Sequence, residues 1–181
     1  MNLDSLIERQ MSLTKGKQMA EEEYRYISSL LGNKNFLVFG TGLDSNIWRL
    51  ANKDGLTIFL EDNIKWINDD DDVYKITYST KLTQADELLL EYQNNITKNL
   101  EIDLPDIVKN IKWDIILVDA PAGNKDHFPG RMQSIYAASK LRNKKTEVLV
   151  HDCDRYVEDI FSNIMLKNLH KQFVKLRSYK L

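Results

Sequence analysis

Four short runs of mostly apolar residues stand out along the chain, and they are continuous rather than alternating. Such runs are typical of parallel β-strands that are buried on both faces. Residues 73–78 alternate apolar and polar side chains, which predicts a further strand, and residues 173–181 predict one or two short strands. The four runs are Phe36–Phe39, Leu56–Leu60, Trp113–Asp119 and Glu147–Val150.

Segments with helical periodicity separate these strands. Apolar residues recur at the i, i+3, i+4 and i+7 spacing that places them on one helix face. Strands alternating with helices predict an α/β fold with a doubly wound, mostly parallel sheet. We expect a single domain over residues 1–181, with residues 1–34 forming a helical segment packed on the core. The predicted helices cover residues 3–32, the stretch after Ser45, residues 64–67, Thr83–Tyr92, residues 132–139 and residues 157–164.

The bulk composition is that of an ordinary globular protein, with 43% hydrophobic and 29% charged residues. A net charge of −2 argues against a non-specific nucleic-acid binder, which needs a basic field. The single Cys153 excludes an internal disulfide. No apolar stretch reaches the roughly 18 residues of a membrane-spanning helix, and the N-terminus has no targeting pattern. We therefore expect a soluble, cytoplasmic chain. Asp69–Asp72 should form a solvated loop, because four adjacent carboxylates repel one another.

The residues after the first strand predict a nucleotide-binding turn. Gly40 and Gly42 allow a tight turn and a close approach of the backbone to a ligand. Glu61 ends the second strand about 20 residues later, which is the spacing at which a carboxylate reaches ribose hydroxyls. Ser45 replaces the third glycine of the dinucleotide fingerprint, and Asp44 or Ser45 either contacts the cofactor or caps the next helix. We expect an adenosine-containing cofactor, S-adenosylmethionine rather than NAD.

Polar residues also follow the later strands, where ligands bind in doubly wound sheets. Asp119 ends one strand, and His151 and Asp152 follow the next. Methyl transfer from a sulfonium needs an aligned acceptor, and a sugar hydroxyl also needs help in losing its proton. In one arrangement Asp119 or His151 is the general base. In the other, Asp119 and Asp152 hold a divalent metal ion that binds the acceptor oxygen.

Arg131 stands at the start of a predicted helix, where a cation opposes the helix dipole. Its planar guanidinium suits a carboxylate on the substrate, although a surface ion pair is the alternative. Tyr136 lies on the same helix face and is either a substrate contact or a core residue. Asp154 is expected to cap the helix that follows it.

Taken together, these motifs resemble one known family. It is the plant polysaccharide-biosynthesis family catalogued as domain of unknown function 579, which includes the glucuronoxylan 4-O-methyltransferases. The resemblance spans about residues 8–165, and the Val-Asp-Ala-Pro and Pro-Gly-Arg-Met motifs in tandem are specific. The matching segments are Asn35–Ser45, Thr57–Glu61, Ala85–Leu89, Trp113–Gly123, Pro129–Tyr136 and His151–Asp152.

The resemblance implies a Rossmann-like class I S-adenosylmethionine-dependent O-methyltransferase. Its acceptor would be a glycan or another saccharide that contains a uronic acid, with O4 of glucuronic acid as the methylated position. Family members carry an N-terminal membrane anchor and are placed in the Golgi, and their aromatic-rich tail differs from the more basic Leu176–Leu181. By position, Gly40, Gly42 and Glu61 would bind the donor, and Asp119, Arg131, His151 and Asp152 would line the acceptor side.

Two other functions are compatible with the same sequence. The first is a non-catalytic S-adenosylmethionine-binding or scaffold protein in polysaccharide biosynthesis, because one branch of the resembled family has no clear activity. The second is a nicotinamide-dependent oxidoreductase, which the glycine turn alone would also permit. Binding of S-adenosylmethionine without NAD separates the methyltransferase from the oxidoreductase.

Overall fold

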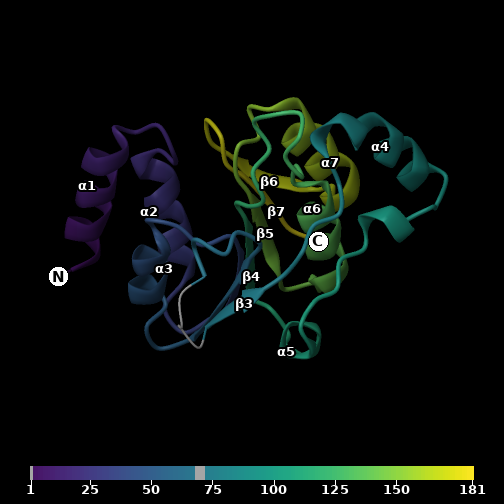
Figure 1. The fold of residues 1–181 in the computed structure, drawn as a ribbon. Helices are drawn as coiled ribbons and strands as arrows, with labels where there is room; N and C mark the ends of the chain where they lie inside the picture. The colour runs from purple at the N-terminus through teal and green to yellow at the C-terminus, as the bar shows by residue number, and fades with distance from the viewer. Residues whose placement is uncertain (1, 68–71) are drawn as a thin grey trace.

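A computed structural model of the protein describes residues 2–67 and 72–181. Its centre is a seven-stranded sheet with the order β3-β2-β1-β4-β5-β7-β6 (Figure 1). The strands are β1 (Asn35–Phe39), β2 (Leu56–Glu61), β3 (Val73–Lys75), β4 (Ile115–Val118), β5 (Glu147–Val150), β6 (Leu169–Gln172) and β7 (Arg177–Tyr179).

The first five strands pair in parallel, and β7 runs antiparallel between β5 and β6. Parallel neighbours need long crossovers, whereas β6 and β7 follow each other closely and pair as a hairpin. Phe39 at the end of β1 pairs with Leu60 and Val118, and Val118 pairs with Val150. The carboxyl ends of β1, β2, β4 and β5 therefore lie level at one edge of the sheet.

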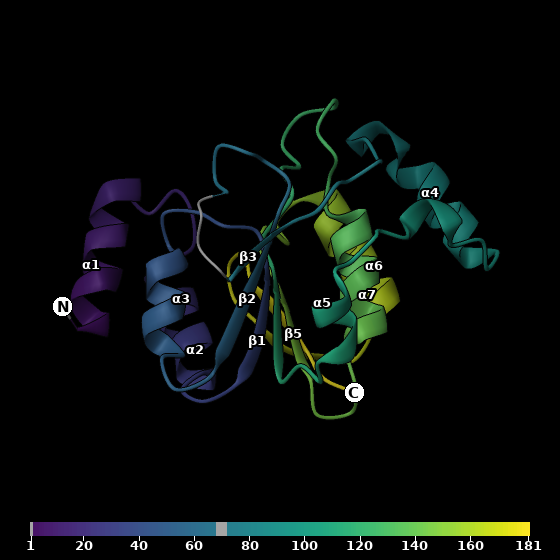
Figure 2. The ribbon, with the colours of Figure 1, turned by 60° about the horizontal axis from the view of Figure 1, so that its bottom comes forward.

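Helices cover both faces of the sheet. Helices α1 to α3 lie on one side and α4 to α7 on the other, as Figure 2 shows. A hydrophobic core lies on each side of the sheet. The core under α1 to α3 contains Tyr24 and Trp48, and the core under α4 to α7 contains Trp113 and Phe161. The helices are α1 (Leu3–Thr14), α2 (Glu21–Leu30), α3 (Ser45–Ala51), α4 (Ala85–Gln93), α5 (Asp106–Asn110), α6 (Met132–Leu141) and α7 (Tyr156–Leu166), with short 3-10 turns at Leu82–Gln84 and Lys98–Leu100.

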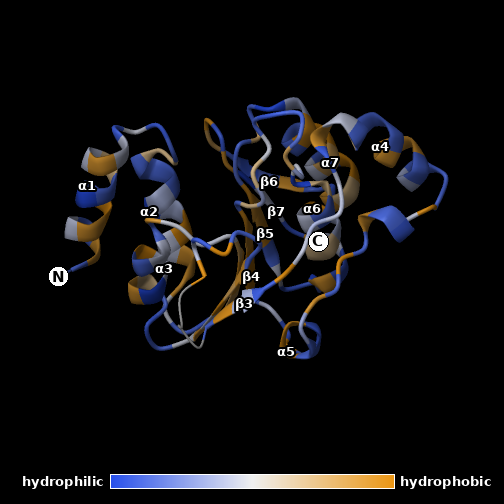
Figure 3. Ribbon diagram, in the orientation of Figure 1, coloured by the Kyte–Doolittle hydropathy of each residue, from blue (hydrophilic) through white to orange (hydrophobic). Residues whose placement is uncertain are grey.

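The central strands form because nearly every side chain in them is apolar and buried. All four residues of β4 and all four of β5 are buried, and Figure 3 shows apolar residues along the middle of the sheet. Each fully buried Val, Leu or Ile contributes about 1.5–3 kcal/mol relative to exposure, which fixes these strands between the helix layers. The predicted doubly wound, mostly parallel fold is confirmed.

Several local predictions need correction. The helix predicted over residues 3–32 is interrupted, because Lys15 and Gly16 adopt positive φ angles of 51° and 66° after α1. Residues 64–66 form a turn rather than a helix, and the tail strand β6 begins before Phe173. Asp69–Asp71 lie outside the described residues. In the described part of the chain, no helix combines the length and the apolar character needed to span a bilayer.

Candidate active site

The glycine turn after β1 is shaped first by the neighbouring strand. Gly40 has a φ of +113°, and a Cβ built on it would lie 2.8 Å from the Cβ of Ala120. No other residue type fits this position, because both its conformation and the approach of Ala120 forbid a side chain. The Gly42 amide donates to the Ser45 hydroxyl over 3.0 Å, which tightens the turn.

Glu61 stands at the buried end of β2 and is held in place by the same turn. Its Oε2 accepts bonds from the Thr41 amide (2.8 Å) and the Thr41 hydroxyl (3.1 Å). Its Oε1 accepts bonds from the amides of Asn63 (2.8 Å) and Asp62 (3.1 Å). The Thr41 hydroxyl also lies 3.1 Å from the Trp66 carbonyl oxygen, so it has an alternative acceptor when a ligand hydroxyl binds Glu61.

A cleft of about 680 Å³ runs over the carboxyl ends of the strands. This volume lies in the range of small-molecule and cofactor sites, about 300–1,000 Å³. The cleft joins the glycine turn to the ends of β4 and β5, as doubly wound folds require. The predicted site residues that line it are Gly40, Gly42, Asp44, Glu61, Asp119, Arg131, His151 and Asp152.

The ends of β4 and β5 bring together a cluster of opposite charges. Nδ1 of His151 lies 3.0 Å from Oδ1 of Asp119. The Arg131 guanidinium bridges two carboxylates, with Nη2 lying 2.7 Å from Oδ2 of Asp152 and 3.2 Å from Oδ1 of Asp119. The side chain of Asp119 is 30% exposed, whereas those of Arg131 and His151 are nearly buried. Asp119 is therefore the most accessible of these three side chains from the cleft.

The protonation states follow from these contacts. Burial alone would lower the pKa of His151, but the Asp119 and Glu23 carboxylates outweigh it and raise the pKa to about 9. Burial would raise the pKa of Asp119, but His151 and Arg131 outweigh it and lower the value. At neutral pH the pair is an imidazolium and a carboxylate. His151 then has no free lone pair, so Asp119 is the better candidate base of the two.

Glu23 is the residue of this site that sequence analysis missed. Three adjacent glutamates, Glu21 to Glu23, are typical of a solvated helix turn, yet Glu23 is fully buried. Its carboxylate accepts bonds from the Ala20, Lys175 and Leu176 amides at 2.8–2.9 Å and lies 3.7 Å from Nε2 of His151. No capping-box motif marked it, because Ala20 stands where that motif has Ser or Thr. Glu23 thus connects α2 to the segment before β7 and to His151.

Arg131 is not the free cation that the sequence suggested. Its guanidinium donates to the carbonyl oxygens of His151 (2.6 Å) and Pro121 (3.3 Å) as well as to Asp152. Each of its three nitrogens is engaged and 4% of the residue is exposed, so Arg131 organises the strand ends. Arg155 also lines the cleft, has a side chain that is 35% exposed and pairs with Asp152 at 3.1 Å.

Three further predicted roles are changed by the structure. Tyr136, on the buried face of α6, is 4% exposed. Its ring packs edge-on against Tyr92 in the core and does not line the cleft. Ser45 is buried, and its hydroxyl accepts a hydrogen bond from the Gly42 amide. It therefore stabilises the turn rather than lining the cleft. Asp154 does not cap α7, because the N-cap is Arg155. Of the two alternatives for Tyr136, the structure shows a core residue, and the cofactor contact of Ser45 stays a prediction.

Asp44 does line the cleft, and its side chain makes no capping bond to α3. Burial and the nearby Asp119 carboxylate raise the pKa of Asp44 to about 7. A carboxyl that is partly protonated near neutral pH can donate as well as accept a hydrogen bond. Asp44 occupies the N-cap position of α3 without a side-chain capping bond, and its contact with the cofactor stays a prediction.

The predicted metal ligands also lie close together. Asp119, His151 and Asp152 each offer one ligand atom, and these atoms lie within 4.8 Å of one another. Two carboxylate oxygens and an imidazole nitrogen form a donor set that suits a divalent cation. The arrangement fits such an ion, which would displace the His151 proton and compete with Arg131 for the carboxylates.

The fold of the chain is that of class I methyltransferases. It superposes on the MycE methyltransferase of the mycinamycin biosynthetic pathway, solved with Mg, SAH and mycinamycin VI, with a TM-score of 0.54, 11% identity and coverage of 99% of this chain and 54% of that one. A putative caffeoyl-CoA O-methyltransferase from Staphylococcus aureus gives a TM-score of 0.50 at 14% identity, covering 100% and 93%.

The sequence comparisons are more specific. Glucuronoxylan 4-O-methyltransferase 1 of Arabidopsis thaliana is 36% identical over 90% of this chain and 67% of its own length. Arabinogalactan O-methyltransferase 1 of the same plant is 36% identical over 75% and 56%. The chain thus spans about half to two thirds of the length of these curated relatives. Residues 24–179 match the family described as IRX15/IRX15L/GXM, and the chain belongs to that family.

Proposed function

We propose that the protein is an S-adenosylmethionine-dependent O-methyltransferase that acts on a uronic-acid hydroxyl of a glycan, with O4 of glucuronic acid as the acceptor. One observation carries the proposal. A donor-binding carboxylate, Glu61, and an exposed acceptor-side carboxylate, Asp119, face the same cleft from the ends of β2 and β4. The names of the relatives, which act on glucuronoxylan and arabinogalactan, support the choice of acceptor.

The donor half of the cleft binds the nucleoside. Glu61 would accept a bond from a ribose hydroxyl at Oε2, and the Thr41 hydroxyl would turn to the Trp66 carbonyl oxygen to make room. A hydrogen bond to a charged acceptor contributes about 1.5–3 kcal/mol, which is enough to set the orientation of the donor. Glu61 and Asp119 line the same cleft, so a donor held at Glu61 would share it with an acceptor held at Asp119.

The acceptor half positions the hydroxyl and receives its proton. His151 and Arg131 hold Oδ1 of Asp119, so Oδ2 is left to accept a hydrogen bond from the acceptor hydroxyl. As the oxygen attacks, the new O–CH₃ bond forms, the S–CH₃ bond breaks with its electron pair going to sulfur, and the proton passes to Asp119. A divalent cation held by Asp119, His151 and Asp152 would supply a lower pKa for the bound hydroxyl.

The carboxylate of the uronic acid needs a cation, and Arg155 is the guanidinium in the cleft with donors to spare. A bidentate pair with its planar fork distinguishes a uronate from a neutral sugar. We expect Arg155→Leu to raise the KM for a uronic-acid acceptor roughly tenfold or more, because a hydrogen-bonded charge pair is lost.

The test compares two matched acceptors with labelled S-adenosylmethionine. One is a glucuronosyl oligosaccharide with a free O4, and the other is the same oligosaccharide after reduction of its carboxyl group. Transfer to the first and not to the second supports the proposal. Binding of S-adenosylmethionine with no transfer to either acceptor, with and without divalent cation, would favour the non-catalytic binding or scaffold function.

A further inference from the structure

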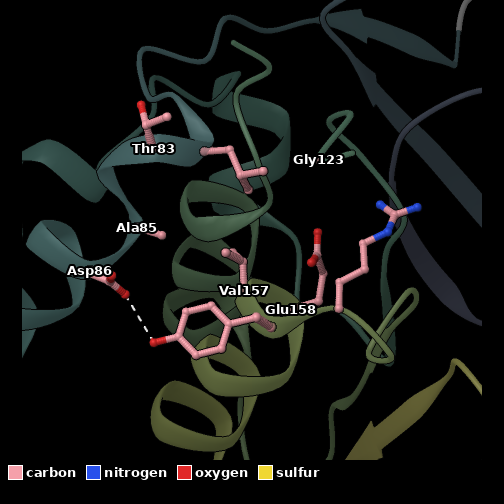
Figure 4. Close-up of a pocket in the computed structure, with 9 residues that line it drawn as sticks. Thr83, Ala85, Asp86, Gly123, Val157 and Glu158 are labelled. Carbon is pink, nitrogen blue, oxygen red and sulfur yellow. Dashed lines mark hydrogen bonds between the residues drawn. The ribbon is translucent and has the colours of Figure 1, made fainter. Parts of the chain in front are cut away.

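A second, smaller pocket lies beside the cleft and has no part in the function described so far. It has a volume of about 280 Å³ and lies between the N-terminal ends of α4 and α7 (Figure 4). It is lined by Leu82, Thr83, Ala85, Asp86, Gly123, Arg155, Tyr156, Val157 and Glu158.

This side pocket adjoins the cleft. Gly123 and Arg155 line both of them, so a molecule that reaches Arg155 from the cleft meets the mouth of the side pocket. Its volume is just below the roughly 300 Å³ at which drug-sized pockets begin. It therefore has room for one ring-sized unit attached to a group in the cleft.

The walls of the side pocket combine an aromatic ring with apolar and hydrogen-bonding groups. Tyr156 is 61% exposed, and its hydroxyl donates to Oδ1 of Asp86 over 3.0 Å, which fixes the ring across the gap between α7 and α4. Leu82 and Val157 add apolar surface. A pyranose or furanose has the matching character, with apolar C–H faces for the ring and edge hydroxyls for the carboxylate.

The charges in the side pocket favour a neutral occupant. The Asp86 carboxylate lines it, and so does the buried Glu158 carboxylate, which has no hydrogen-bond partner among the described residues and lies 4.0 Å from Nε of Arg131. The Glu158 carboxylate lies against Gly123, where a Cβ would approach Oε1 to 2.8 Å. The cation on the wall, Arg155, also lines the cleft, where the proposed function gives it the carboxylate of the uronic acid. A uronate placed here would meet like charge, whereas hydroxyls would find acceptors.

We propose that the side pocket is an acceptor subsite for one neutral sugar residue, the unit linked to the uronic acid that is methylated. The proposal rests on the proposed function and extends it. The uronate would bind at Arg155, and its neutral neighbour would stack on Tyr156 and donate a hydroxyl to Asp86. The enzyme would thus distinguish a uronic acid within a glycan from a free one.

The kinetic test uses Tyr156→Ala, with Tyr156→Phe as the matched control that keeps the ring and loses only the bond to Asp86. For a glucuronosyl acceptor linked to a neutral sugar, Tyr156→Ala should raise KM about tenfold, and Tyr156→Phe should raise it much less. For a simple methyl glucuronide both variants should match the wild type. Equal effects on the two acceptors, or no effect on either, would overturn the subsite.

A binding measurement separates this proposal from the methyl transfer itself. Neutral β-linked disaccharides, one of pentose and one of hexose, are titrated by NMR into the wild type and Tyr156→Ala. Shifts of residues around Tyr156 in the wild type and their loss in Tyr156→Ala support the subsite even if no acceptor is methylated. The absence of binding of either disaccharide by the wild type, or binding unchanged in Tyr156→Ala, would contradict it.

Discussion

Replacing Glu23 by glutamine should destabilise the protein by several kcal/mol, although Glu23 lies in a run of three glutamates that looks solvated. The buried carboxylate accepts bonds from three amides and faces the His151 imidazolium at 3.7 Å. Glutamine has nearly the same shape but only one acceptor oxygen. If that oxygen keeps the Lys175 and Leu176 amides, the new NH₂ group faces two donors, the Ala20 amide and His151.

Three estimates of the loss in unfolding free energy overlap at about 3 kcal/mol. Leaving a buried donor unsatisfied costs about 1–3 kcal/mol, and removing one partner of a buried ion pair costs about 3–5 kcal/mol. Burial would raise the pKa of Glu23, but His151 and the amides outweigh it and lower it from 4.5 to about 2. A shift of this size corresponds to about 3 kcal/mol at neutral pH. Because the folded pKa is depressed, this contribution is complete above about pH 5 and is lost as the pH falls toward 2.

Urea unfolding followed by tryptophan fluorescence at pH 7 and pH 3 measures the effect. At pH 7 we expect Glu23→Gln to lower the free energy of unfolding by about 3–5 kcal/mol, and at pH 3 by less than half as much. The matched control is Glu22→Gln, since Glu22 is exposed on the same turn and should change little. A Glu23→Gln protein as stable as Glu22→Gln would refute the buried network.

Three other changes test separate parts of the account. Glu61→Gln should weaken S-adenosylmethionine binding about ten- to a hundredfold in calorimetry, through loss of charge-assisted ribose bonds. Asp119→Asn should lower kcat about 10²- to 10⁴-fold and leave donor affinity unchanged; equal loss of donor binding would contradict its role as the base. Burial raises the pKa of Glu147, but hydrogen bonds from Ser178 and Tyr26 outweigh it and lower the value. Glu147→Gln should therefore lower the free energy of unfolding at pH 7. The loss should be smaller in acid, where the wild type loses this contribution as well.

The strands and the site edge could be predicted because they depend on local pattern. Continuous apolar runs gave the positions of β1, β2, β4 and β5, and the acid after a run marked the strand end at Glu61 and Asp119. Topology then places such ends together, whatever the distance along the chain. The glycine turn was also predictable, although the requirement at Gly40 comes from Ala120, just after β4, rather than from a ligand alone.

The partners of the charged residues could not be predicted, because they are set by contacts between distant segments. Arg131 looked available for a substrate carboxylate, but Asp152 and the carbonyl oxygens around it engage the whole guanidinium. Glu23 looked solvated, but amides 152 and 153 residues away along the chain fold back onto it. A charge pattern in one segment does not reveal which segment will bury it.

The central claim is methyl transfer to a uronic-acid hydroxyl in the cleft between Glu61 and Asp119, and NMR of the product tests it most directly. The protein is incubated with S-adenosylmethionine carrying a ¹³C methyl group and a glucuronosyl oligosaccharide with free O4, with and without a divalent cation. We predict a new methoxyl signal correlated with C4 of the glucuronic acid for the wild type, and its loss in Asp119→Asn. No methoxyl signal on the uronic acid in either condition, from a wild-type protein that binds the donor, would contradict the account.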